Sequence, residues 1–243
     1  MALLEVTDLS RRFRGLAAVD GLSFAVEAGQ TVAIIGPNGA GKTTTFNLLS
    51  GLLAPDHGRI VFAGQDMTTW PAHRRCRAGL GRTFQIVQPF EDLSVLENVM
   101  VGALFGQEPR PRLADAQAQA ERLCALVGLG DRMEAPVHDL TVPDRKRLEV
   151  ARALATRPRL LLLDEAMEGL TPAEEREAVQ LLKGVREQGV TLLLIEHVMS
   201  SVRELSDHVI VMDYGRKLAE GSYAEISRDP RVIEAYLGAE AEL

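Results

Sequence analysis

The segment GPNGAGKT at 36–43 has the residue types and spacing that bind phosphate groups. Gly36, Gly41, Lys42 and Thr43 match the P-loop pattern, in which the lysine reaches the β- and γ-phosphates and the hydroxyl ligates Mg²⁺. Glycines let backbone N–H groups turn toward phosphate oxygens, and the N-terminus of a following helix adds positive partial charge. A glycine turn that binds nothing is the weaker interpretation, because an apolar run at 31–35 precedes the segment and a helical pattern follows it. The residues expected to bind nucleotide here are Gly36, Pro37, Asn38, Gly39, Ala40, Gly41, Lys42, Thr43 and Thr44.

Two acids end a second apolar run, LLLLDE at 160–165. Ligands of open α/β sheets bind at the carboxyl ends of the strands, which is where these acids fall. We expect Asp164 to hold Mg²⁺, directly or through water, and Glu165 to orient and deprotonate an attacking water molecule. The alternative is a plain strand ending in a helix-capping acid. The two motifs together predict a P-loop NTPase, a class that includes small-molecule kinases.

The elements that must position these residues follow an alternating pattern. Runs rich in Val, Ile and Leu alternate with amphipathic stretches, which implies a mainly parallel sheet covered on both faces. The expected strands lie at 3–9, 22–26, 31–35, 58–62, 80–84, 160–163, 191–195 and 209–212. The expected helices lie at 42–52, 95–105, 114–127, 145–156 and 172–188, with a short one after Met199.

The stretch at 86–157 differs, because it is helical without a clear strand and contains a loop-like segment at 107–112. We interpret it as a helical subdomain inserted in the α/β core. The chain, 1–243, is therefore expected to be one domain. Its nucleotide-binding core is 1–85 with 158–243, and its helical subdomain is 86–157.

Composition limits the classes of function. The 243 residues are 46% hydrophobic and 25% charged, as in ordinary soluble domains. The apolar runs are far shorter than the roughly 18 residues that span a bilayer, and the acidic N-terminus does not resemble a signal peptide. Any link to a membrane should therefore go through a partner.

A net charge of −7 argues against a nucleic-acid-binding protein. We interpret the basic clusters at 11–14 and 145–147 as solvated faces. Cys76 and Cys124 lack the spacing of metal ligands and are expected to be free thiols in a reducing cytosol.

Three further features narrow the class. Gln85 follows GLGRTF, His197 follows TLLLIE, and LTVPDRKRLEVARAL at 140–154 directly precedes the Asp164 strand. With GPNGAGKTTT in this order, essentially the whole chain resembles an ABC-transporter nucleotide-binding subunit. The details are similar to the branched-chain amino acid branch of that family. They are GRTFQIVQPFEDLSVLENVMVGAL at 81–104, GLTP at 169–172 and DPRVIEAYLG at 229–238.

The resemblance implies a fold, cofactors and partners. The fold would be an ABC-type P-loop NTPase, with a mainly parallel core sheet, an antiparallel β portion and an inserted helical subdomain. ATP and Mg²⁺ would bind, and ATP hydrolysis would power an importer of branched-chain amino acids or related small polar or organic-acid solutes. The partners would be a second, different ATPase subunit, two transmembrane permease subunits and, indirectly, a solute-binding protein, with this chain peripheral on the cytoplasmic face of the inner membrane.

Residue roles also follow from the resemblance. Phe13 would stack on adenine, with a plain core residue as the alternative. Gln85 would touch Mg²⁺ and the attacking water, and His197 would hydrogen-bond the γ-phosphate. The loop after Gln85, with Ile86, Val87 and Phe90, would contact the membrane subunit.

The sequence departs from the family at its signature segment. Leu140 to Asp144 replaces the LSGGQ-like motif, and both glycine positions hold other residues. Thr141 keeps a hydroxyl in the serine position and would bind nucleotide, whereas Pro143 has no N–H to donate and Asp144 should repel phosphate unless Arg145 or Lys146 compensates. We therefore expect a heterodimer with one strong and one weak ATP site. The alternatives are a soluble ABC protein acting on ribosomes or DNA, and a regulatory subunit that binds ATP and barely turns it over.

Overall fold

The computed structural model describes residues 2–85, 88–107 and 111–240. Two compact units account for the chain, one made of Met1–Ala72 with Thr191–Leu243 and the other of His73–Val190. The expected residues Ile86 and Val87, and positions 108–110 of the expected loop, lie outside the described residues. Among the described residues, no helix combines the length and hydrophobicity needed to cross a membrane.

The first unit contains an antiparallel sheet in the order β2-β1-β4-β5. Its strands are β1 (Ala2–Phe13), β2 (Leu16–Glu27), β4 (His57–Phe62) and β5 (Gln65–Asp66). β1 and β2 are longer than the sequence pattern indicated. Several register shifts interrupt their pairing, and each shift breaks the period-two alternation on which a sequence pattern depends.

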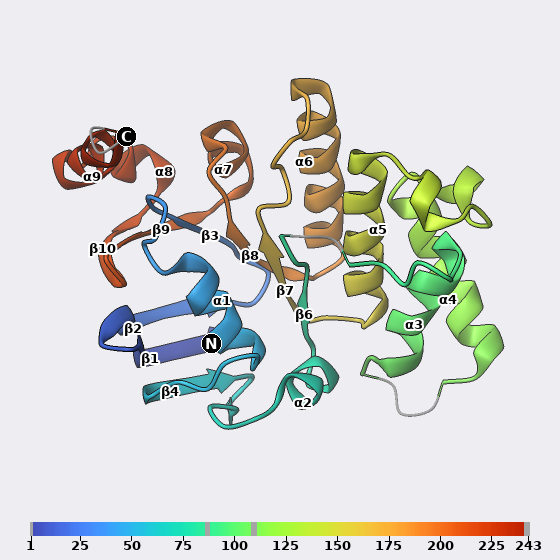
Figure 1. Cartoon of the computed structure of the whole chain (residues 1–243), viewed down its shortest axis with the longest axis horizontal. Helices are drawn as coiled ribbons and strands as arrows, with labels where there is room; N and C mark the ends of the chain where they lie inside the picture. Colours follow the sequence, from blue (N-terminus) through green and yellow to red (C-terminus); the bar gives the residue numbers. More distant parts are fainter. Residues whose placement is uncertain (1, 86–87, 108–110, 241–243) are drawn as a thin grey trace. The chain divides into compact units, whose positions relative to one another are not determined.

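Parallel strands form the second part of this unit. β3 (Thr31–Ile35) pairs in parallel with β8 (Thr191–Ile195) and with β9 (His208–Asp213), and β10 (Arg216–Gly221) runs antiparallel to β9. All five residues of β3 and of β8 are buried, as expected for parallel strands covered on both faces. The helices of the unit are α1 (Lys42–Ser50), α7 (Met199–Leu205), α8 (Tyr223–Ile226) and α9 (Pro230–Glu240). Figure 1 shows α1 between the β1–β2–β4 sheet and the β3–β9 strands.

The second unit pairs two parallel strands, β6 (Leu80–Arg82) and β7 (Leu160–Asp164), and is otherwise mainly helical. Helices α3, α4 and α5 pack on one another, and Figure 1 shows α6 beside α5. The helices are α2 (Ala72–Arg77), α3 (Val95–Phe105), α4 (Leu113–Leu126), α5 (Val142–Ala155) and α6 (Pro172–Glu187), with short 3₁₀ turns at Gly130–Arg132 and Val137–Asp139.

The α/β class, with a parallel and an antiparallel portion and a helical segment, is confirmed. Several helix boundaries differ from the expected ones by one or two residues, and the largest difference is at the start of α5. α5 begins at Val142, three residues before the expected start, because Thr141 caps it through a hydrogen bond from the Asp144 N–H and Pro143 fits the first helical turn. Elements that the pattern did not predict are β5, α2, β10, α8 and α9.

Candidate functional site

The P-loop connects β3 to α1 in the first unit. Gly36 and Gly41 have φ angles of 150° and 98°. A Cβ at Gly36 would lie 2.1 Å from the Met212 carbonyl oxygen of β9, and one at Gly41 would lie 2.2 Å from the Ala18 carbonyl oxygen of β2. Backbone atoms cannot yield to such an approach, so both positions require glycine. The loop is therefore fixed between two strands that come from distant parts of the sequence.

Lys42 is buried at the start of α1. Its Nζ donates to the carbonyl oxygens of Gly36 and Pro37, at 2.6 and 3.0 Å, so the ammonium is held inside the loop. Thr43 is exposed, Thr44 is half-buried, and the first turn of α1 contains no acidic residue. The helix N-terminus, the lysine and the exposed hydroxyl together make a positively polarised loop that suits a phosphate.

Tyr236 of α9 also reaches the P-loop. Its side chain hydrogen-bonds the Gly36 backbone, and burial raises the pKa of Tyr236 to about 12. The first glycine of the motif therefore bonds to α9 and lies close to the backbone of β9.

Phe13 and His197 belong to the same unit as the P-loop. Phe13 ends β1 and faces Leu16 across the β1–β2 hairpin, with the guanidinium of Arg11 5.2 Å from its ring centroid. Phe13 is 41% exposed, which argues against the plain-core alternative and leaves its ring available for stacking. His197 follows β8 and is exposed, next to the buried Glu196.

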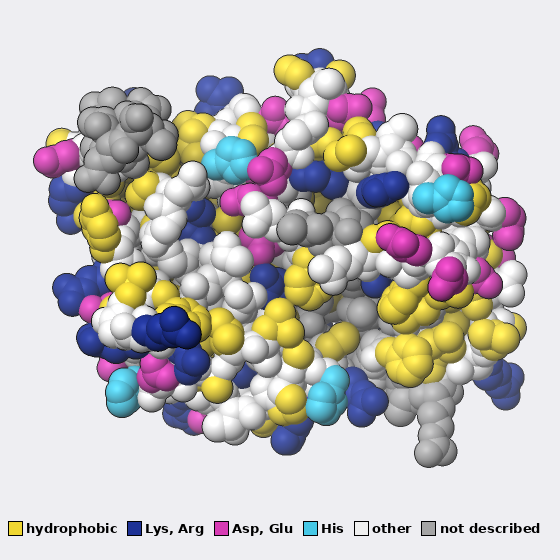
Figure 2. Space-filling view, viewed as in Figure 1, with side chains coloured by type: hydrophobic (Ala, Val, Ile, Leu, Met, Phe, Trp, Pro, Cys, Tyr) yellow, Lys and Arg dark blue, Asp and Glu magenta, His cyan; other side chains and the backbone are white. Residues whose placement is uncertain are grey.

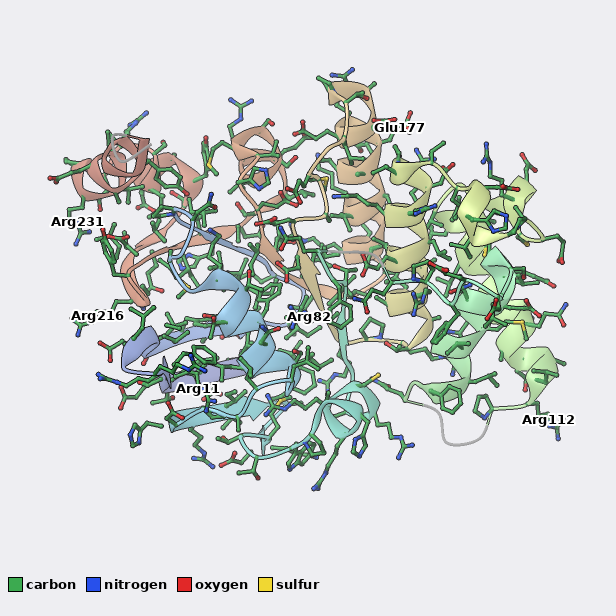
Figure 3. All side chains as sticks on the ribbon, viewed as in Figure 1. Arg11, Arg82, Arg112, Glu177, Arg216 and Arg231 are labelled. Carbon is green, nitrogen blue, oxygen red and sulfur yellow. The ribbon has the colours of Figure 1, made fainter. Side chains whose placement is uncertain are left out.

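The two acids of LLLLDE lie in the second unit, at the end of β7. Asp164 pairs with Arg82 of β6, with 2.9 Å between the guanidinium and a carboxylate oxygen, and the two side chains are 1% and 7% exposed. Burial lowers the pKa of Arg82, although the charge of Asp164 opposes this effect. Arg82 is labelled in Figure 3. The charge next to Asp164 is thus supplied by a residue that the sequence analysis did not select.

Gln85 and Glu165 are in direct contact. Gln85 Nε2 donates to Glu165 Oε2 at 2.6 Å, and Lys146 Nζ donates to the Glu165 carbonyl oxygen at 3.0 Å. Glu165 has a φ of 50°, an uncommon backbone conformation for a residue with a side chain. These groups line a small pocket whose walls are Thr83, Phe84, Gln85, Lys146, Glu149, Val150, Asp164, Glu165 and Ala166. The pocket brings together three of the residues predicted for catalysis or metal binding.

Glu149 was not predicted, although it is buried in the wall of this pocket. It accepts a hydrogen bond from the Phe84 N–H at 2.5 Å. Burial raises the pKa of Glu149 to about 7, against the opposing effects of that hydrogen bond and of Arg152 and Lys146. The sequence signal was an acid in LEVARALA, where the neighbouring residues Leu148 and Val150 are apolar and buried.

The signature segment caps α5. The Thr141 hydroxyl donates to the Asp144 carboxylate at 2.9 Å, and Val142 is 60% exposed. Arg132 and Arg147 both lie 3.6 Å from Asp144. These two arginines therefore balance the charge of Asp144. Arg145 donates instead to the carbonyl oxygens of Leu140 and His138, and Lys146 donates to the Glu165 carbonyl oxygen.

The basic cluster at 145–147 is also not a solvated face. All three side chains are half-buried, and Arg147 pairs with Glu177 of α6 at 2.5 Å. The cluster at 11–14 is more exposed, although Arg11 pairs with Asp56 at 2.8 Å.

Among the described residues, no group of three or more His, Cys, Asp or Glu side chains could hold a metal ion. Cys76 and Cys124 are free thiols. Figure 2 shows hydrophobic side chains gathered over α3 and α4, and the exposed apolar residues of this region include Phe90, Phe105 and Leu113.

Comparison with known proteins gives two matches to family models. The family described as "ABC transporter" matches residues 19–168, and "Branched-chain amino acid ATP-binding cassette transporter" matches residues 216–242.

Similar relatives match over nearly their full length. The chain is 40% identical to the high-affinity branched-chain amino acid transport ATP-binding protein BraF of Pseudomonas aeruginosa, covering 97% of this chain and 98% of BraF. It is 38% identical to LivG of Escherichia coli, with the same coverage. A solved structure, the ADP conformation of MJ1267, an ATP-binding cassette of an ABC transporter, is similar with a TM-score of 0.90 and 30% identity, covering 98% of this chain and 99% of that one.

Proposed function

Because the chain belongs to the ABC transporter family of ATP-binding proteins, we propose that it powers an importer of branched-chain amino acids or related small polar or organic-acid solutes. As a member of this family it is an ATPase subunit of a transporter. The observation that carries the solute class is the branched-chain amino acid family match at 216–242, a segment outside residues 19–168, which match the general ABC transporter model. The names of BraF and LivG support the same class.

The residues of the chain fit a nucleotide with Mg²⁺. Gly36 and Gly41 keep the loop free of the Cβ atoms that would collide there, and Lys42 supplies a positive charge. Thr43, Gln85 and Asp164 offer a hydroxyl, an amide and a carboxylate oxygen, which are the hard ligands that Mg²⁺ prefers. When bound, Mg²⁺ neutralises phosphate charge.

The catalytic roles fall on three side chains. Glu165 accepts the proton of the attacking water, and Gln85, hydrogen-bonded to that carboxylate at 2.6 Å, orients both. His197 donates to the γ-phosphate, and Phe13 stacks on the adenine. Thr141 contacts the nucleotide of the opposite subunit once its hydroxyl leaves the Asp144 carboxylate.

The proposed assembly joins this chain to a different ATPase subunit and to two permease subunits, on the cytoplasmic face of the membrane. Phe90 and the residues that follow Gln85 contact a permease, and the exposed apolar side chains near α3 and α4 are consistent with that interface. The core at 1–85 and 158–243 binds nucleotide, and the helical subdomain at 86–157 carries the signature segment and the permease contact.

The two ATP sites of this assembly should be unequal. Val142 presents a β-branched side chain and Pro143 lacks an N–H at the segment that would face the partner's nucleotide. Glu165→Gln in this chain should remove most of the ATPase activity of the assembled transporter, and the equivalent change in the partner should remove less. Equal losses, or rapid hydrolysis by a homodimer of this chain, would show that Val142 and Pro143 are tolerated in the glycine positions of the signature segment.

The solute class is tested by reconstitution. The chain, its partner ATPase and the permease subunits are assembled in proteoliposomes, and ATP-dependent uptake of radiolabelled leucine is measured with the solute-binding protein supplied. We expect uptake with the wild-type chain and none with Lys42→Ala. ATP hydrolysis without uptake of leucine, isoleucine or valine would exclude the branched-chain amino acids and leave the ATPase activity standing. Uptake of the related small polar and organic-acid solutes would then be measured in the same proteoliposomes.

A further inference from the structure

Helix α5 carries three polar side chains at intervals of three residues, Lys146, Glu149 and Arg152. This spacing places them along the same side of the helix. Each one bonds to backbone outside α5. Lys146 donates to the Glu165 carbonyl oxygen at 3.0 Å, Glu149 accepts from the Phe84 N–H at 2.5 Å, and Arg152 donates to the Gln88 carbonyl oxygen at 2.8 Å.

These bonds hold the Gln85 segment on both sides. Glu149 binds the residue directly before Gln85, and Arg152 binds the third residue after it and lies 4.9 Å from the ring centroid of Phe90. Gln85 itself donates to the Glu165 carboxylate, and Lys146 of α5 donates to the Glu165 backbone carbonyl oxygen. The hydrogen bonds therefore form a closed circuit from α5 through Gln85 and Glu165 and back to α5.

We propose that Glu149 is a positioning residue, which acts through the Phe84 N–H to hold the Gln85 amide against the Glu165 carboxylate. The proposal rests on the roles proposed above for Gln85 and Glu165. It also makes α5 the element that connects the signature segment at its N-terminus to the catalytic pair of the same chain. A shift of α5 on contact with a partner would change the separation between Gln85 and Glu165.

The surroundings of Glu149 favour this role over packing alone. The side chain is 8% exposed and lines the same pocket as Gln85 and Glu165. The charged groups that influence it are Lys146 and Arg152 on its own helix, Asp164 of β7 and Arg82 of β6. An apolar residue would fill the volume equally well, but it would leave the Phe84 N–H without its carboxylate acceptor.

The test compares Glu149→Ala with Glu149→Gln in the assembled transporter, measuring kcat and KM for ATP. We expect Glu149→Ala to lower kcat by about ten- to a hundredfold, because a small displacement of a catalytic group has effects of this size. KM should change by less than about threefold, because a group that acts in the chemical step changes kcat without changing ground-state binding. Glu149→Gln keeps an oxygen that accepts the same N–H and should restore most of the lost kcat.

The matched control is Gln119→Ala. Gln119 is also 8% exposed, and its amide donates to the Ala155 carbonyl oxygen at the other end of α5, at 2.8 Å. This variant should lose stability with kcat nearly unchanged. A loss of kcat equal to that of Glu149→Ala, at equal loss of stability, would mean that Glu149 only stabilises the fold. If Glu149→Ala does not fold, Glu149→Asp replaces it, since it keeps the charge, is too short for the Phe84 N–H and should also lower kcat.

A double-mutant cycle identifies the route of the effect. If Glu149 acts through Gln85, Glu149→Ala should lower kcat far less in a Gln85→Ala background than in the wild type. Additive losses would overturn the proposal. Wild-type kcat in Gln85→Ala alone would instead refute the proposed role of Gln85, so the two failures are distinguishable.

Discussion

The buried pair between Arg82 and Asp164 gives a prediction whose magnitude follows from the structure. The two side chains are 7% and 1% exposed and their charged atoms are 2.9 Å apart. With an effective dielectric constant of about 20, their Coulomb interaction is about 6 kcal/mol. Removing one partner of a buried pair typically destabilises by about 3–5 kcal/mol, because the other charge stays buried without compensation.

The experiment is a double-mutant cycle on the free energy of unfolding, measured by urea denaturation with circular dichroism. Arg82→Met should cost about 3–5 kcal/mol, and Arg82→Met combined with Asp164→Leu should recover most of that loss. The control is Arg216→Met, which removes a surface pair of 2.6 Å with Asp20 in which the arginine side chain is 72% exposed. This change should cost under about 1 kcal/mol. Equal costs for the two arginine variants, or a double variant no more stable than Arg82→Met, would refute the reasoning.

Three further predictions concern single side chains. Lys42→Ala should abolish useful ATP affinity without unfolding the chain, because the Lys42 ammonium is held in the loop proposed to bind the phosphates. Near-normal binding in a calorimetric titration of the folded variant would contradict this prediction. Burial raises the pKa of Glu149 from 4.5 to about 7, so its contribution to stability is present in full below pH 4.5 and is lost as the pH rises through about 7. Glu149→Gln should therefore gain stability relative to the wild type between pH 5 and 8, by at most about 3–4 kcal/mol. A pH-independent difference in urea denaturation would argue against a titrating Glu149. Phe90→Asp should uncouple transport, because the ring is 46% exposed and is proposed to contact the permease. Basal ATPase activity should persist, because an aspartate at this position can pair with Arg152. Undiminished transport would place the permease contact elsewhere.

Local patterns made the P-loop and the two acids predictable. The glycine spacing, the apolar strands before each motif and the helix after Lys42 are all contiguous in sequence. The fold class followed from the same alternation. These features need no knowledge of which distant residues meet.

Contacts between distant residues were not predictable. Arg82 and Asp164 are 82 positions apart, and Glu149 and Phe84 are 65 apart. Residues at 145–147 looked solvated because three consecutive cations give no periodicity, yet Lys146 reaches Glu165. β10 was missed because RKLAEG is polar and only half-buried, which removes the apolar alternation of a strand.

The P-loop glycines lie against carbonyl oxygens of β2 and β9. These two strands should therefore tolerate substitutions better than insertions or deletions. Gly36 and Gly41 approach backbone atoms of Met212 and Ala18, so a new side chain at position 212 or 18 leaves those oxygens where they are. One residue added to or removed from β2 or β9 would move the oxygen by about 3.3 Å and turn it to the other edge of the strand. Functional variants of this chain should therefore keep both strands at constant length. Position 18 can change residue type, and position 212, which is fully buried, can accept other apolar residues of similar volume.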